Sequence, residues 1–237
     1  MVSNHLKGYA NRKLLGRLAD GKEDPDRIDE RRGVASRDRP DGQLIWFHAA
    51  SVGESLSLLD LISRLRDDDP NLNVLITTGT QTSAELLSKR LPPEVIHQFV
   101  PVDARPFVRR FLDHWRPNVA VWTESELWPS MIHETHARDV PMILLNARMS
   151  EKSAASWKWA RGMAKSLLDR FRLILAQDTL SQKRLLQLGA DPTKTSVNGS
   201  LKQSGGALPY NEIDRNSLAE NLGTRQVWLA ASTHQGE

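Results

Sequence analysis

From residue 43 onward, short apolar runs alternate with segments whose apolar residues recur at helical spacing. The runs are nearly continuous in apolar residues, as expected of strands in a parallel sheet that helices cover on both faces. They predict strands at 43–49, 73–78, 95–100, 118–123, 141–146, 172–177 and 195–199. The intervening segments predict helices at about 55–66, 82–91, 104–115, 129–138, 151–170 and 179–188.

This repeated alternation predicts an α/β fold with a Rossmann-like, doubly wound parallel sheet over residues 43–200. Ligands of such sheets bind outside the carboxyl ends of the strands. The segments that follow the predicted strands are rich in hydroxyl, amide or carboxylate groups; they read "ASVGES", "TGTQTS", "TESELWPS", "NARMSEKS" and "AQDTLS". None of them is G-x-G-x-x-G or a Walker loop, so we expect no dinucleotide or P-loop chemistry and no cofactor.

Residues 1–42 precede the first predicted strand and begin with a basic stretch. The first nineteen residues contain no acid, and their cations are Lys7, Arg12, Lys13 and Arg17. Because several leucines fall near helical spacing, the stretch resembles a helix that lies on an anionic membrane surface. The alternative is a solvated or partly disordered terminus, which Gly8 and Gly16 favour because glycine weakens a helix.

The alternation stops after Gly199. Residues 201–225 are polar, with a glycine pair and a proline, and predict a linker. Residues 226–232 then predict a new strand, so 226–237 reads as the first strand and turn of a second domain that is cut short. A lone strand of this kind has no partner against which to bury its apolar face.

Composition narrows the classes of function. The chain has 237 residues, of which 39% are hydrophobic and 26% charged, as in a soluble globular protein. It has no cysteine and therefore no thiolate metal site or disulfide. The segment from His133 to His136 is one residue short of the zinc-binding H-E-x-x-H pattern, so we expect no metal. The net charge of +3 is small, and we expect no nucleic-acid partner.

Glu54 begins a predicted helix directly after the first strand. The sequence from Ser51 to Glu54 fits the capping box S-x-x-E, in which each side chain binds a free amide of the other residue's backbone. A carboxylate at this edge can also act as a general base, and Gly53 beside it would let a substrate approach the backbone. The pattern alone favours the cap.

Two further strand ends carry candidate residues. Glu124 and Glu126 follow the predicted strand at 118–123, where they can complement the start of the next helix or line a site. Arg148 follows the strand at 141–146, where its guanidinium can clamp a carboxylate or phosphate, or pair with a neighbouring acid.

Seven motifs occur in this sequence in the same order and with the same spacing as in a known protein family. They are "GKEDPDRIDERRG", "WFHAASVGES", "TESELWP", "LLNARMSEKS", "LILAQD", "NGSLK" and "AASTHQGE". With them the chain resembles, from about residue 21 to 237, the 3-deoxy-D-manno-octulosonic acid (Kdo) transferases of lipopolysaccharide assembly. The resemblance implies the N-terminal half of a GT-B glycosyltransferase, in which two Rossmann-like domains face each other across a cleft.

The resemblance also implies a reaction. Members of the family transfer Kdo from CMP-Kdo to a hydroxyl of a lipid A precursor, with inversion and without a metal. The acceptor binds to the N-terminal domain, and most of the CMP-sugar binds to the C-terminal domain. The general base of the family corresponds to Glu54, with Ser51 and Gly53 beside it, so the resemblance reverses the preference for a cap alone.

Other residues correspond to family motifs and are expected to bind substrate: Glu124, Glu126, Lys202, Ser232, Thr233 and His234. The family resemblance places the protein at the cytoplasmic face of the inner membrane, although the basic start replaces the usual apolar anchor helix. Without the C-terminal domain this half is expected to be inactive. The alternatives are another GT-B glycosyltransferase, a nucleotide-sugar epimerase, or a non-catalytic Rossmann-like binding module.

Overall fold

A computed structural model of the protein describes residues 2–201 and 210–228, with side chains from residue 8 onward. The chain divides into two units, Met1–Ser204 and Gly205–Glu237. The first unit holds a seven-stranded sheet in the order β3-β2-β1-β4-β5-β6-β7. Every neighbouring pair of strands is parallel; the strands are β1 (Leu44–Ala49), β2 (Asn73–Thr78), β3 (Ile96–Phe99), β4 (Val119–Thr123), β5 (Met142–Ala147), β6 (Leu173–Ala176) and β7 (Thr195–Val197).

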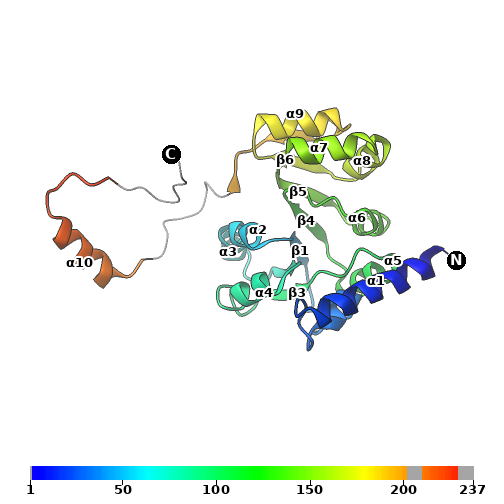
Figure 1. Cartoon of the computed structure of the whole chain (residues 1–237), viewed down its shortest axis with the longest axis horizontal. Helices are drawn as coiled ribbons and strands as arrows, with labels where there is room; N and C mark the ends of the chain where they lie inside the picture. Colours follow the sequence, from blue (N-terminus) through cyan, green and yellow to red (C-terminus); the bar gives the residue numbers. More distant parts are fainter. Residues whose placement is uncertain (1, 202–209, 229–237) are drawn as a thin grey trace. The chain divides into compact units, whose positions relative to one another are not determined.

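Helices cover both faces of this sheet (Figure 1). One face carries α2 (Val52–Ser57), α3 (Leu59–Asp68) and α4 (Gln81–Ser88), whose core includes Leu58, Ile62 and Leu87. The other face carries α5 (Arg105–Trp115), α6 (Pro129–His136), α7 (Glu151–Lys158), α8 (Arg161–Leu168) and α9 (Thr179–Gln187). The order of strands reverses between β1 and β4, and the helices change face at the same place. The predicted α/β fold with a doubly wound parallel sheet is therefore confirmed.

Two predicted helices are each divided in two. The segment at 55–66 forms α2 and α3, because the hydroxyls of Ser55 and Ser57 donate back to main-chain carbonyls, which bends a helix. The segment at 151–170 forms α7 and α8, separated at Ala160, whose φ of −122° and ψ of 39° lie outside the helical region.

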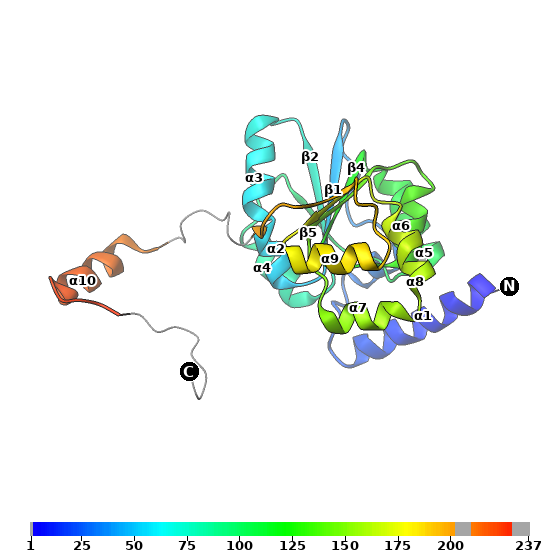
Figure 2. The ribbon, with the colours of Figure 1, turned by 90° about the horizontal axis from the view of Figure 1, so that it is seen from above.

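The N-terminal segment is part of the first unit, in contrast to the alternative of a solvated terminus. Helix α1 (Val2–Ala19) lies alongside α5 (Figures 1 and 2). Its Ala10 and Leu14 are buried, and Ala10 packs with Phe107 of α5. No helix among residues 2–201 and 210–228 is long and apolar enough to cross a bilayer.

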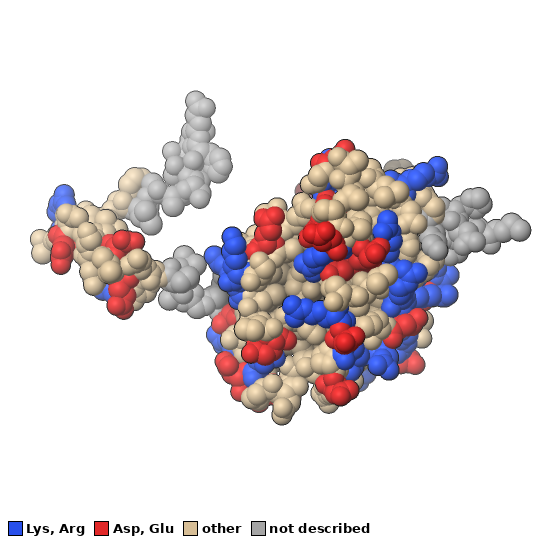
Figure 3. All heavy atoms as spheres, turned by 90° about the horizontal axis from the view of Figure 1, so that it is seen from below, with Lys and Arg blue, Asp and Glu red and all other residues tan. Residues whose placement is uncertain are grey.

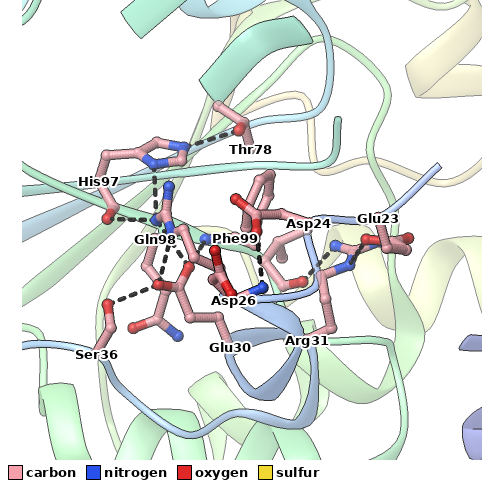
Figure 4. A network of polar contacts seen from close by, with 12 residues as sticks. Glu23, Asp24, Asp26, Glu30, Arg31, Ser36, Thr78, His97, Gln98 and Phe99 are labelled. Carbon is pink, nitrogen blue, oxygen red and sulfur yellow. Dashed lines mark hydrogen bonds and ion pairs between the residues drawn. The ribbon is translucent and has the colours of Figure 1, made fainter. Parts of the chain in front are cut away.

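A network of buried charges ties residues 23–36 to the edge strand β3 (Figure 4). The Glu30 carboxylate accepts hydrogen bonds from the Arg27 guanidinium at 2.9 and 2.8 Å, from Ser36 Oγ at 2.6 Å and from the Phe99 amide at 2.7 Å. The short helix η1 (Ile28–Arg32), which carries Glu30, ends at Gly33. A Cβ at Gly33 would lie 2.0 Å from the Phe107 carbonyl oxygen, so only glycine permits this approach.

The second unit contains α10 (Glu212–Leu222), within the residues that the sequence predicted to be a linker. Asn211 caps this helix by accepting from the amides of Ile213 and Asp214, and no residue of α10 is buried. The local capping signal therefore specifies a helix where composition alone indicated a linker. Of the strand predicted at 226–232, residues 226–228 are not in a strand and the others lie outside the described residues.

Charged side chains of both signs are intermixed over the face of the first unit that Figure 3 shows. Among the described ion pairs, the carboxylate of Glu134 in α6 binds two arginines of α5. Arg105 and Arg109 each donate to it at 2.8 Å. Burial alone would raise the pKa of Glu134, but hydrogen bonds from Arg109, Arg105 and Arg138 lower it to about 2. These pairs hold α6 against α5.

Replacement of Glu30 tests the tie between the N-terminal segment and β3. Glu30→Ala removes the acceptor of the Phe99 amide and leaves Arg27 without its counter-charge, so we expect it to lower the free energy of unfolding by about 3–5 kcal/mol. Asp29→Ala is the matched control, because the Asp29 carboxylate is exposed and pairs with Arg32 at the surface. It should cost less than about 1 kcal/mol in the same urea titration. Equal losses in the two variants would show that the network is not structural.

Candidate functional site

The carboxylates predicted at two strand ends meet at one place in the structure. Glu54 follows β1, while Glu124 and Glu126 follow β4, and these two strands are neighbours in the sheet. They flank the point at which the strand order reverses, which is where open α/β sheets bind their ligands. Burial is the main reason why the pKa of Glu126 is raised, and the charges of Glu54 and Glu124 raise it further, so both carboxylates lie close enough to act on Glu126.

Glu54 takes part in a capping interaction at the start of α2. Ser51 is the N-cap residue, and its hydroxyl oxygen accepts from the Glu54 amide at 3.4 Å. The same hydroxyl donates to Glu54 Oε1 at 2.7 Å. Gly53 lies in the first turn, beside the carboxylate in sequence, and is exposed. The Ser51 half of the predicted capping box is therefore present, whereas the Glu54 carboxylate accepts from the Ser51 hydroxyl and the Ala50 amide and not from the predicted Ser51 amide.

The second carboxylate oxygen of Glu54 joins β1 to β4. Glu54 Oε2 accepts from the Ala50 amide at 3.0 Å. It also lies 2.9 Å from Thr123 Oγ1, whose single proton can be donated either to Glu54 or to the His48 carbonyl, also at 2.9 Å. Glu54 is 6% exposed, so its carboxylate is buried and not open to solvent at the edge of the sheet. Thr123 is a site residue that sequence analysis missed, because it reads as the last residue of a strand.

Glu126 and the start of α6 are fixed by two neighbours. Trp128 donates its indole N–H to Glu126 Oε2. The Asp103 carboxylate, from the segment after β3, accepts from the amides of Ser130 and Met131 at 3.1 and 2.8 Å and so caps α6. Burial raises the pKa of Glu126; the Trp128 hydrogen bond lowers it, and repulsion from Glu54 and Glu124 raises it further.

Two residues near the ends of β4 and β5 have left-handed backbone angles. Glu124 has a φ of 54° and Asn146 a φ of 51°, in the left-handed region that residues with a side chain seldom adopt. The pairing of β5 with β6 shifts register between Leu144 and Ala147, around Asn146. Such irregularities persist where the surrounding structure holds them and are concentrated at functional sites.

Buried hydrogen bonds join the end of β1 to β2 next to the carboxylates. His48 is fully buried, its Nδ1 lies 3.1 Å from Thr77 Oγ1, and Trp46 donates to the same oxygen at 2.8 Å. Burial lowers the pKa of His48 to about 3, so the imidazole is neutral at physiological pH. Its ring packs edge-on against Trp128 with centroids 5.1 Å apart. His48 therefore positions Trp128; it lies within the motif "WFHAASVGES", but the sequence analysis assigned it no role.

A cavity of about 520 Å3 lies next to this cluster. One wall consists of the segments that follow β1 to β4, and the opposite wall is α1 with Glu23 and Arg31. Ala50, whose amide binds Glu54, and Trp128, whose indole binds Glu126, are both in the wall. The cavity therefore connects α1 to the backbone that holds the carboxylates.

The remaining predicted site residues lie elsewhere. Arg148 is exposed and lines a separate hollow of about 270 Å3 with Arg184 and Asp178, between the starts of α7 and α9. Lys202, Ser232, Thr233 and His234 lie outside the described residues. Within the described part of the chain, no three His, Asp or Glu side chains gather as metal ligands. Glu134 of the "HETH" segment is engaged with arginines instead.

This arrangement suits proton transfer. One carboxylate, Glu54, is held rigidly at a helix start, and one of its oxygens is bound by the hydroxyl of an exposed serine, Ser51. A ligand hydroxyl that displaced Ser51 would lie at hydrogen-bond distance from that oxygen. The geometry therefore fits a general base for a hydroxyl group.

Known proteins resemble this chain in sequence and in fold. A family model described as 3-deoxy-D-manno-octulosonic-acid transferase (kdotransferase) matches residues 26–204. A 3-deoxy-D-manno-octulosonic acid transferase of Rickettsia bellii is 38% identical over 92% of this chain and 51% of its own length. One of Rickettsia felis is 39% identical over 81% of this chain and 40% of its own length. The chain thus spans about half the length of these relatives.

A solved structure, that of a putative UDP-N-acetylglucosamine 2-epimerase from Listeria monocytogenes, has the same fold, with a TM-score of 0.54. The match covers 77% of this chain and 51% of the epimerase at 13% sequence identity. At that identity the likeness concerns the fold alone.

The raised pKa of Glu126 predicts a pH-dependent stability. Because the folded-state pKa lies above the ordinary value of 4.5, the folded protein binds more protons at this site than the unfolded chain. Ionisation of Glu126 therefore lowers the free energy of unfolding as the pH rises from the unfolded-state pKa through the higher folded-state pKa. Glu126→Gln keeps an acceptor for Trp128 and removes the charge, so its free energy of unfolding, relative to the unmodified protein, should increase from about pH 4 to about pH 7 in urea titrations. A constant difference across this range would contradict the assigned shift.

Proposed function

The chain belongs to the 3-deoxy-D-manno-octulosonic acid (Kdo) transferase family, and on this premise we propose that the intact protein is an inverting glycosyltransferase that transfers Kdo from CMP-Kdo to a lipid A precursor. The chain contributes the half that binds the acceptor and carries the base. The observation that supports this best is the position of Glu54, beside the reversal of strand order and with Ser51 Oγ 2.7 Å from Oε1.

The proposed reaction follows from that geometry. An acceptor hydroxyl displaces Ser51 and donates its proton to Glu54 Oε1 as its oxygen attacks the anomeric carbon of the donor sugar. The new carbon–oxygen bond forms on the face opposite the bond to the CMP phosphate, which breaks and leaves its electron pair on the nucleotide. The Ala50 amide and the Thr123 hydroxyl hold Oε2 and orient the carboxylate throughout.

We propose that most of the donor binds to sequence beyond this unit. On the strength of the family motifs, Ser232, Thr233 and His234 lie near the CMP-sugar, and Lys202 and Arg148 near an anionic group of either substrate. Glu124 and Glu126 shape the acceptor side of the cleft.

We further propose that the protein works at the cytoplasmic face of the inner membrane, with α1 near the lipid headgroups. Of the α1 cations, Arg12 is exposed and lies outside the cavity wall, whereas Lys13 and Arg17 belong to that wall. Arg12 is therefore the α1 cation with which to test the membrane contact. Deletion of α1 would not serve, since it would uncover Phe107.

Glu54→Gln tests the base. The amide retains the shape and the capping geometry but accepts no proton, so we expect kcat of the intact protein to fall by about 100- to 10,000-fold in a Kdo-transfer assay with CMP-Kdo and a lipid A precursor. The urea midpoint should change little. Ser51→Ala is the companion variant, because it removes the capping hydroxyl and leaves the carboxylate. It should retain activity within about tenfold and lose about 1 kcal/mol of stability.

Two results would contradict this role. Equal loss of activity in Ser51→Ala and Glu54→Gln would reduce Glu54 to a cap. Full activity of Glu54→Gln would favour a non-catalytic module or a reaction with another base.

Arg12→Glu tests the membrane contact in a flotation assay with vesicles that contain anionic lipid. Each basic residue near such a surface contributes about 1 kcal/mol, so reversal of the charge should weaken binding about tenfold, with less effect at high salt. Arg64→Glu is the control, because Arg64 is an exposed arginine of α3, on the opposite side of the sheet from α1. Equal effects of the two variants would reject α1 as the contact.

A further inference from the structure

The cavity between α1 and the strand ends has a lining of unusual composition. Four α1 residues at spacing i, i+3, i+4 and i+7 face it, and they are Ala10, Lys13, Leu14 and Arg17. The facing wall contributes Val102, Leu127, Trp128 and Pro129. Most of this surface is carbon, and the charged groups come from the α1 side and from Glu23, Arg31 and Asp103.

Most polar groups of the lining already have partners. Glu23 pairs with Arg17 at 2.6 Å and with Arg31 at 3.1 Å, and Arg31 also donates to the Val100 carbonyl. Asp103 caps α6, and the Thr80 hydroxyl lies 2.7 Å from Ser83 Oγ. A ligand rich in hydroxyl groups would find few free donors or acceptors and would lose hydrogen bonds to water on entering. The lining therefore disfavours a sugar or a nucleotide.

Lys13 differs from the other cations of the cavity. It is exposed, and it has no hydrogen-bond or ion-pair partner within the part of the chain that the structure describes. An ammonium at the rim of an apolar groove is complementary to a ligand with an apolar body and one anionic group. A volume of about 520 Å3 lies within the range of pockets that hold such molecules.

We propose that this groove binds one apolar chain of an anionic amphiphile, with Lys13 beside the anionic group. Ala50 and Trp128 lie in the groove wall, so the end of the chain that joins the polar head lies next to the backbone that holds Glu54 and Glu126. The amphiphile is the lipid acceptor of the reaction; this identification rests on the proposed function, whereas chain binding itself does not. The groove thus binds the apolar chain of the acceptor, while the carboxylates bind the acceptor's hydroxyl group.

The direct test is calorimetric titration of the intact protein with methyl, butyl, hexyl and octyl phosphate below their micellar concentrations. Each methylene transferred to an apolar groove should tighten binding about threefold to fourfold, so affinity should climb steadily along the series. An affinity that does not depend on chain length would indicate an anion site only and overturn the proposal.

Two matched variants locate the site. Lys13→Glu should weaken octyl phosphate binding about tenfold, whereas Arg12→Glu, the same change one residue earlier on α1, should alter it less than about twofold. Val102→Asp, on the half-buried wall, should reduce the dependence on chain length. Equal effects of Lys13→Glu and Arg12→Glu would place the binding elsewhere and overturn the proposal.

Kinetics identify the source of the chain. If the acceptor occupies the groove, Lys13→Glu raises the KM for the lipid acceptor and leaves kcat within about twofold. If Lys13→Glu instead weakens vesicle binding more than Arg12→Glu does and leaves KM unchanged, the occupant is a bilayer lipid, and the assignment to the acceptor is wrong. Glu54→Gln should still bind octyl phosphate, so a failure of the catalytic proposal and a failure of the groove are distinguishable.

Discussion

The hydrogen bonds of one carboxylate connect the two halves of the sheet. Glu54 Oε2 receives the Ala50 amide from the end of β1 and lies within reach of the Thr123 hydroxyl at the end of β4. The chain leaves β1 toward one face of the sheet and β4 toward the other, so their loops separate and leave backbone groups without partners. Glu54 satisfies those groups and is fixed by them, and it therefore gains a rigid position without large movements of the surrounding chain.

The residues around Glu54 include several features that lower the stability of the folded protein. Glu126 is half-buried near two other acids, and Glu124 and Asn146 have backbone angles that side chains disfavour. A structure optimised for stability alone would not gather like charges and a left-handed glutamate after one strand. Elsewhere the buried Glu134 holds α6 against α5, and the buried Glu30 holds the N-terminal segment against β3. The unfavourable charges and backbone angles of the site are thus offset by stabilising contacts elsewhere in the same unit.

Most of the framework could be predicted from the sequence, because the strands are continuous apolar runs and the sheet is buried on both faces. The sequence also predicted that Glu54, Glu124 and Glu126 follow strands, whereas their proximity depends on β1 and β4 being neighbours in the sheet. What could not be predicted depends on contacts distant in sequence. Buried charges such as Glu30 read as polar surface until Arg27 and the Phe99 amide are seen beside them. The burial of Glu54 and the role of Thr123 likewise become visible only when β1 and β4 are adjacent.

The indole of Trp128 has two neighbours of different character, the cavity on one side and the Glu126 carboxylate on the other. A hydrogen bond to a carboxylate stabilises its ionised form, so any displacement of the indole alters the proton affinity of Glu126. By thermodynamic reciprocity, occupancy of the cavity and protonation of Glu126 are then coupled quantities. A ligand that displaces the indole on entering the cavity would therefore cause protons to be exchanged with the buffer. Binding in an apolar cavity would in this way be linked to the protonation of Glu126.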